Sequence, residues 1–263
     1  MDPLALPSWE IILLLCVAAA AAGWIDAVTG GGGLLQLPAI LVGVPQASAV
    51  QALGTNKVSG VFGTAAATVT YLRRIRPDFR TAIPMAATAF VGAMAGASTA
   101  SLLPADIFRP IIVVLLAAVW LWTLLRPEMG SVDNIRWKGT RKHYAVAVAA
   151  GLVIGFYDGI LGPGTGSFLL IVLVSVLGYS FLSASVTAKI VNLGTNLGAI
   201  IVFGLTGSIL WTLALLMAVC NVGGAVVGAR TAIARGSGFV RVVFLVVVAM
   251  LIIRLAWEVF GGG

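Results

Sequence analysis

Two aspartates and two lysines lie inside long apolar stretches of the chain: Asp26, Lys57, Asp158 and Lys189. A charge near the bilayer centre costs about 2.5–3.5 kcal/mol, so each needs a partner or an aqueous cavity. The lysines could hold a small anion, and the aspartates could set the lysine charge state or carry a coupling proton. The structural alternative is two Lys–Asp salt bridges that only join helices. The two interpretations are compatible, because a lysine can form a salt bridge and also bind an anion.

Two glycine-rich stretches, residues 30–33 and 162–167, interrupt the apolar sequence. Each glycine weakens a helix by about 1 kcal/mol relative to alanine, and Pro163 lacks a backbone donor. We therefore expect broken helices, each followed by a short helix whose uncapped N-terminus attracts anions. Close packing of small residues is the structural alternative. The candidate donors are Gly31, Gly32, Gly33, Gly164, Thr165, Gly166 and Ser167.

Polar residues near the two lysines could complete a binding site, or could hydrogen bond between helices. Asn192 follows Lys189 by three positions and so shares its helix face. Thr55 and Thr187 precede the lysines by two positions and need not point the same way. The further candidates are Asn56, Asn196 and Gln36.

The composition limits the elements that can position these residues. Hydrophobic residues make up 60% of the 263 and charged residues 10%, against about 25% charged in soluble domains. So few polar side chains cannot cover a soluble protein, which excludes a soluble enzyme or a nucleic-acid-binding protein. The net charge of +7 fits cytoplasmic loops of a membrane protein. We predict an all-α polytopic membrane protein.

Ten apolar segments are apparent, five in each half. Segments 34–44 and 166–178 are short and fit half-helices, whereas most of the others can span about 30 Å of hydrocarbon. The segments are 9–28, 34–44, 47–71, 81–103, 107–125, 143–160, 166–178, 181–204, 209–231 and 239–258.

The two halves repeat one pattern at an offset of 132 residues, at which Asp26 and Lys57 recur as Asp158 and Lys189. This indicates an internal duplication. We divide the chain into a first transmembrane repeat at 1–125, a cytoplasmic basic linker at 126–142 and a second repeat at 143–263.

An odd number of segments in each half predicts that the second repeat is inverted relative to the first. Loop 72–80, the linker and loop 230–241 carry most of the basic residues. Placing all three in the cytoplasm puts both termini outside, in the inner membrane of a bacterium.

Two GxxxG patterns also repeat at this offset, and they predict close helix crossings. Their glycines are Gly92, Gly96, Gly224 and Gly228.

The motifs resemble those of the TauE/SafE family of sulfite exporters and sulfonate permeases. The first motif comprises Gly23-Trp-Ile-Asp26, Gly30-Gly-Gly-Gly-Leu-Leu, Pro38 and Leu53-Gly-Thr-Asn-Lys57, and the second comprises residues 155–167 with Ala188-Lys189. The resemblance covers essentially the whole chain. It implies export or uptake of sulfite, sulfoacetate, taurine-related sulfonates or similar small organosulfur anions.

These observations predict a secondary transporter for a small sulfur-containing oxyanion, such as sulfite, sulfoacetate or another organosulfonate, that works by alternating access. The resemblance implies that it is an exporter. Its partners are that anion and the lipid bilayer, without nucleic acid, cofactor or metal, and a homo-oligomer is compatible with the sequence. The absence of an ATP-binding motif points to a gradient, or the substrate itself, as the energy source. The alternatives are an anion channel and an intramembrane aspartyl protease that uses the two aspartates; we expect no enzyme.

Overall fold

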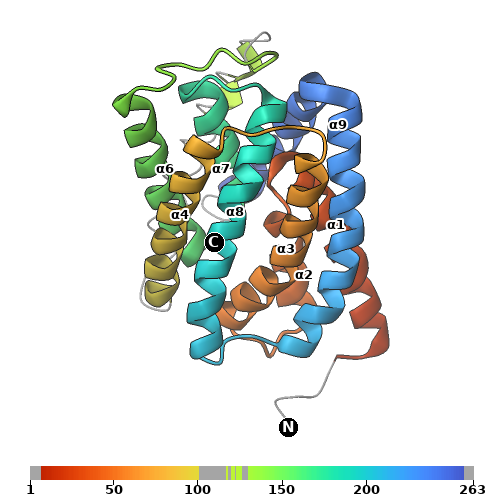
Figure 1. Ribbon diagram of the computed structural model, residues 1–263. Coiled ribbons are helices and arrows are strands. Elements are labelled where there is room, and N and C mark those ends of the chain that lie inside the picture. Colours follow the sequence, from red (N-terminus) through yellow and green to blue (C-terminus); the bar gives the residue numbers. More distant parts are fainter. Residues whose placement is uncertain (1–6, 101–116, 118–119, 122, 126–129, 258–263) are drawn as a thin grey trace.

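The computed structural model describes residues 7–100, 117, 120–121, 123–125 and 130–257, and this part is all-α, as predicted (Figure 1). Most of the predicted segment 107–125 lies outside the described residues. The helices are α1 (Trp9–Thr29), α2 (Gly33–Gly43), α3 (Ala49–Leu72), α4 (Phe79–Thr99), α6 (Arg141–Ile160), α7 (Thr165–Ile171), the π-helical η1 (Val172–Val176), α8 (Phe181–Leu205) and α9 (Trp211–Ala256).

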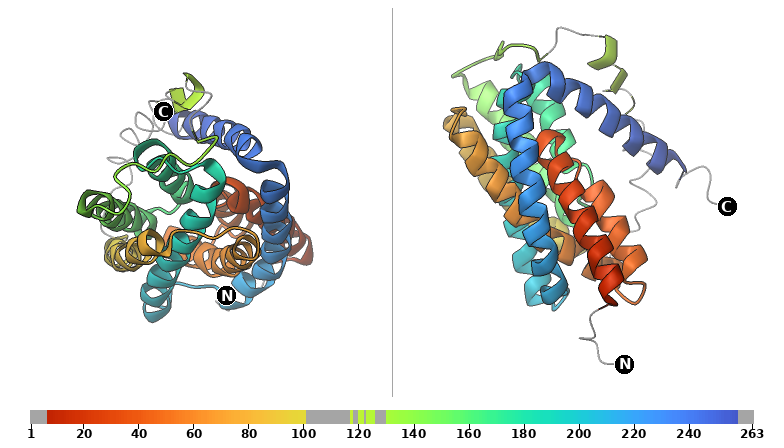
Figure 2. Two further views of the ribbon diagram at one scale, coloured as in Figure 1. Left: turned by 45° about the horizontal axis from the view of Figure 1, so that its top comes forward. Right: turned by 90° about the vertical axis from the view of Figure 1, so that its right-hand side faces the viewer.

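Five of the described helices are long and apolar enough to cross a membrane: α1, α4, α6, α8 and α9. Helix α9 covers two predicted segments, and the non-helical Gly236, with a φ of 73°, makes a kink between them. Figure 2 shows this sharp turn at the end of the molecule that carries the linker. Helices α2 and α7 are short, as the glycine-rich breaks predict.

The helices that carry the two lysines begin with equivalent serine caps. The Ser48 hydroxyl accepts a hydrogen bond from the Gln51 amide, and that of Ser180 accepts one from the Ser183 amide, both at 3.2 Å. Such caps satisfy amide groups that have no partner at the start of a helix. They fix where α3 and α8 begin, and Lys57 and Lys189 each follow nine positions later.

Corresponding helices of the two halves run in opposite directions (Figure 1). Helices α1 and α3 rise from the end where the chain starts, whereas α6 and α8 descend from the linker. The packing corresponds as well: α4 lies along α6 and against α8, and α9 lies along α1 and against α3.

The GxxxG glycines lie at close helix crossings, which confirms that prediction. A Cβ atom at Gly96 would collide with the carbonyl oxygen of Phe156 on α6, and one at Gly224 with that of Ala20 on α1. The absence of side chains at these positions therefore lets α4 pack on α6 and α9 on α1.

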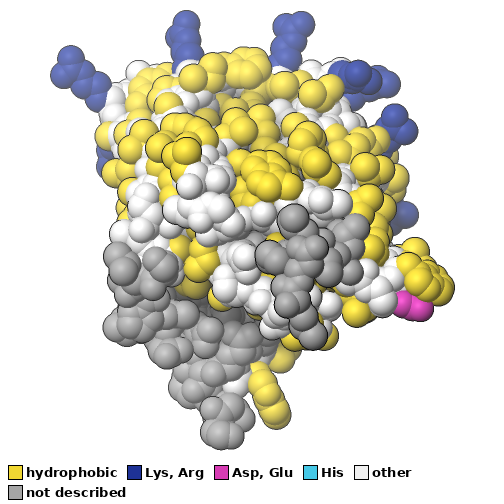
Figure 3. All heavy atoms as spheres, turned by 90° about the horizontal axis from the view of Figure 1, so that it is seen from below, with side chains coloured by type: hydrophobic (Ala, Val, Ile, Leu, Met, Phe, Trp, Pro, Cys, Tyr) yellow, Lys and Arg dark blue, Asp and Glu magenta, His cyan; other side chains and the backbone are white. Residues whose placement is uncertain are grey.

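The described basic side chains collect towards one end of the bundle. Figure 3 shows the opposite end, where Lys and Arg project only at the rim and no described atoms of either residue cover the face. This asymmetry fits the predicted cytoplasmic position of the basic loops.

Candidate functional site

Two buried ion pairs connect the halves of the chain. Lys57 Nζ lies 2.5 Å from Asp158 Oδ2, and Lys189 Nζ lies 2.8 Å from Asp26 Oδ2. Each lysine thus pairs with the aspartate of the opposite half. Both lysines are almost completely buried, as is Asp158, whereas the Asp26 side chain is 19% exposed.

The glycine-rich breaks bring the two halves together beside these pairs. Helix α1 ends at Gly30, whose φ of 78° is left-handed, and the Gly166 amide donates to the Gly30 carbonyl oxygen at 3.1 Å. A Cβ atom on Gly166 would collide with the Gly30 backbone. The glycines therefore permit close contact between the breaks, and Asp26 and Asp158 lie in the last turns of the helices before them.

One small cavity of about 40 Å³ lies beside the ion pairs: Lys57, Asp158 and Asp26 line it, whereas Lys189 does not. Its lining is polar and comes from both halves. The lining residues are Ala22, Asp26, Gly30, Gly32, Gly33, Gln36, Asn56, Lys57, Gly60, Thr64, Asp158, Gly162, Thr165, Asn192, Asn196 and Asn221.

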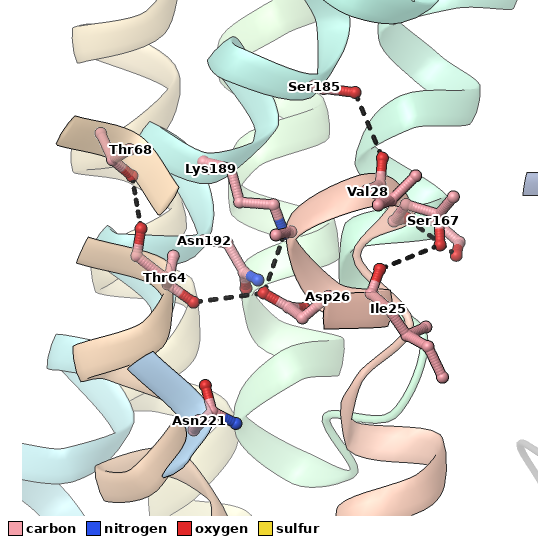
Figure 4. Close-up of polar contacts among 12 residues, drawn as sticks. Ile25, Asp26, Val28, Thr64, Thr68, Ser167, Ser185, Lys189, Asn192 and Asn221 are labelled. Atoms are coloured by element: carbon pink, nitrogen blue, oxygen red, sulfur yellow. Dashed lines mark hydrogen bonds and ion pairs between the residues drawn. The ribbon is translucent and has the colours of Figure 1, made fainter. Parts of the chain in front are cut away.

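Each aspartate has a hydroxyl partner besides its lysine. Thr64 donates to Asp26 Oδ2 at 3.3 Å, and Thr165 donates to Asp158 Oδ1 at 2.6 Å. Figure 4 shows Asn192 beside the contacts that join Asp26 to Lys189 and Thr64. The carboxylates are thus held by fixed donors in addition to the lysines.

Among the residues predicted for the site, several line the cavity together with Asp26, Lys57 and Asp158: Gly32, Gly33, Asn56, Thr165 and Asn192, with Gln36 and Asn196. Lys189 does not line the cavity and reaches it only through its ion pair with Asp26.

Other predicted residues lie outside the lining, and most of these contribute to packing or to hydrogen bonds between elements. Thr55 accepts from the Leu210 amide, and Thr187 donates to the Ser183 carbonyl oxygen within α8. Ser167 donates to the Thr29 carbonyl oxygen at 3.2 Å.

The predicted glycines outside the lining are Gly31, Gly164 and Gly166. Gly31 packs towards Val247, where a Cβ atom would meet that side chain. Gly164 forms the N-cap of α7 with a φ of 84°. The Gly166 amide, predicted to be free for an anion, is instead occupied by the Gly30 carbonyl oxygen. The expectation of a bare N-terminus is therefore wrong for this amide of α7.

Six lining residues were not among the predicted site residues. Gly30 and Gly162 belong to the glycine-rich breaks, and the other four are Ala22, Gly60, Thr64 and Asn221. The repeat offset could have found two of them, because Gly60 and Thr64 correspond to Asn192 and Asn196. Asn221 has only the weaker signal of an amide side chain within an apolar helix.

A family model described as sulfite exporter TauE/SafE matches residues 15–255. The chain belongs to the TauE/SafE family. The match spans both halves and all four charged residues of the two ion pairs. The resemblance inferred from the motifs is therefore confirmed.

Relatives of this TauE/SafE protein match over most of their length. A probable membrane transporter protein, ORF9, from Sinorhizobium sp. is 39% identical over 94% of this chain and 93% of its own. The probable membrane transporter protein YfcA of Escherichia coli strain K12 is 33% identical over 94% and 90%. A probable membrane transporter protein of Haemophilus influenzae is 30% identical over 94% and 95%. No solved structure matches the chain.

Family and fold together make this TauE/SafE protein a multi-pass membrane transporter. The two ion pairs beside its cavity comprise two cations and two anions, so their formal charge is balanced when all four groups are ionised. An anion that enters must therefore compete with a carboxylate for a lysine. Each carboxylate pairs with its own lysine, which does not correspond to the two directly interacting carboxylates of an aspartyl protease.

Proposed function

We propose that this protein is a secondary transporter that exports a small sulfur-containing oxyanion such as sulfite, sulfoacetate or another organosulfonate. Family membership supports the substrate class. The observation that carries the proposal is that Lys57 and both aspartates line one cavity, while each lysine pairs with the aspartate of the opposite half. Such a site can hold an anion and can couple its binding to the relative position of the halves.

Binding would proceed by exchange of lysine partners. The incoming anion takes the place of a carboxylate at Lys57 or Lys189. The displaced Asp158 or Asp26 would then be a buried charge without its cation, and it is stabilised by taking up a proton. This links movement of the anion to movement of a proton, and a proton gradient can then supply the energy.

Alternating access would follow from motion of one half relative to the other. Opposite helix directions in the two halves support inverted-topology repeats, an architecture in which such motions expose a central site to each side in turn. Because both ion pairs cross between the halves, their exchange would alter contacts that hold the halves in one arrangement.

Transport of radiolabelled sulfite and sulfoacetate into proteoliposomes tests this function directly. We expect saturable transport by the unaltered protein and none by Lys57→Met or Lys189→Met. A Ser185→Ala variant is the matched control, because Ser185 is buried on α8 but does not line the cavity. Normal transport by both lysine variants would overturn the site, and large single-channel currents would instead identify an anion channel.

A further inference from the structure

Gln36 presents a buried amide group without a partner at the central cavity. Its side chain is 2% exposed, and Nε2 has no hydrogen-bond partner among the described residues. Its other amide atom, Oε1, accepts from Asn221 Nδ2 at 2.8 Å. Asn221 thus fixes the Gln36 side chain with its donor unused, although leaving a buried donor unpaired is unfavourable.

Backbone donors at the start of α2 line the same cavity. Gly32 is the N-cap of α2 and Gly33 its first residue, and no described group accepts from either amide. The Asn56 side chain lies beside Gly33: a Cβ atom placed on Gly33 would be 3.6 Å from Asn56 Nδ2. The positive end of the helix dipole adds to the attraction for an anion.

The second half contributes Asn192 and Asn196 to the cavity but has no counterparts of Gln36 and Asn56. At the repeat offset Gln36 corresponds to Phe168, and Asn56 corresponds to Ala188. The amide of Gly166 near the start of α7 already bonds to Gly30. The lysines and aspartates are therefore duplicated, whereas the amide side chains of Gln36 and Asn56 have no counterpart at the repeat offset.

We propose that the transported anion binds asymmetrically, at the N-terminus of α2, and that Gln36 is a specificity-determining residue that selects oxyanions over halides. This inference rests on the proposed function. A sulfite or sulfonate group offers three oxygens in different directions, which can accept from Gln36 Nε2, the Gly33 amide and Lys57 Nζ together. A spherical halide of similar charge cannot satisfy all three donors at full hydrogen-bond geometry. Asn221 acts through Gln36 as a positioning residue.

The test compares transport of sulfite, sulfoacetate and bromide in proteoliposomes. Gln36→Met retains the side-chain length but has no donor, and we expect it to lower the oxyanion-to-bromide transport ratio by about 10-fold to 100-fold. Gln36→Glu should abolish oxyanion transport, because it adds a negative charge. Asn221→Ala should lower the same ratio while bromide transport persists, an outcome that a purely structural role would not produce.

Controls separate this inference from the proposed function. Ser185→Ala should leave the ratio unchanged, and thermal unfolding of each purified variant measures folding independently. If the unaltered protein carries sulfite but Gln36→Met keeps its selectivity, the assignment of Gln36 is overturned and the transporter function stands. If the unaltered protein carries none of these anions, both proposals fail.

Discussion

Replacing Lys57 with methionine tests whether the ion pairs across the halves determine stability. The change removes a cation 2.5 Å from Asp158 and keeps a side chain of similar length. The remaining carboxylate has a side-chain exposure of only 2%, so water cannot replace the lost partner. Thr165 still donates to it but carries no charge.

The expected loss follows from this burial. Removing one partner of a buried ion pair costs about 3–5 kcal/mol, because an uncompensated charge remains. Replacing both partners by neutral groups is often nearly neutral. Lys57→Met should therefore destabilise the protein by about 3–5 kcal/mol, and adding Asp158→Asn should restore most of this loss. A loss of this size lowers the midpoint of unfolding by on the order of 10 °C.

The measurement is thermal unfolding in detergent, followed by size-exclusion chromatography of the protein that remains folded. The matched control combines Lys57→Met with Asp26→Asn, which neutralises the aspartate of the same half. This control should be no more stable than the single variant, because it also leaves Lys189 without its partner. Equal rescue by Asp26→Asn and Asp158→Asn would refute the pairing between opposite halves.

Three further outcomes are expected. Lys189→Met should cost less stability than Lys57→Met, since the Asp26 side chain is 19% exposed at the cavity; an equal or larger thermal shift would contradict this. Gly224→Ala should lower the unfolding midpoint because its Cβ would strike α1, whereas Gly223→Ala, with no atom within 4 Å, is the control; equal midpoints would contradict the close crossing. Burial raises the pKa of Tyr179, which lies outside the spanning segments, from 10.0 to about 12. Its stabilising contribution is thus complete below pH 10 and lost as the pH rises towards 12, so a pH series of unfolding midpoints should show a smaller alkaline loss for Tyr179→Phe than for the unaltered protein.

The sequence alone determined the class of protein and the charged residues of the site. In lipid, the backbone N–H and C=O groups of a long apolar run must be hydrogen bonded within the run, which requires a helix. The spanning segments therefore follow from composition. Charges within such runs are costly, which marked Asp26, Lys57, Asp158 and Lys189. The glycine-rich breaks could also be predicted from the sequence, because consecutive glycines and a proline disfavour a continuous helix.

Only the tertiary structure decided which lysine meets which aspartate and which neighbours face them. Spacing along one helix fixes a face but not the opposing helix, so the pairing across the halves required the packed bundle. The same reason explains Asn221, which reaches Gln36 from 185 positions away, and Gly166, whose amide is used by Gly30. Local patterns specify helices, breaks and buried charges, whereas the partners of those charges depend on contacts between distant segments that no local pattern contains.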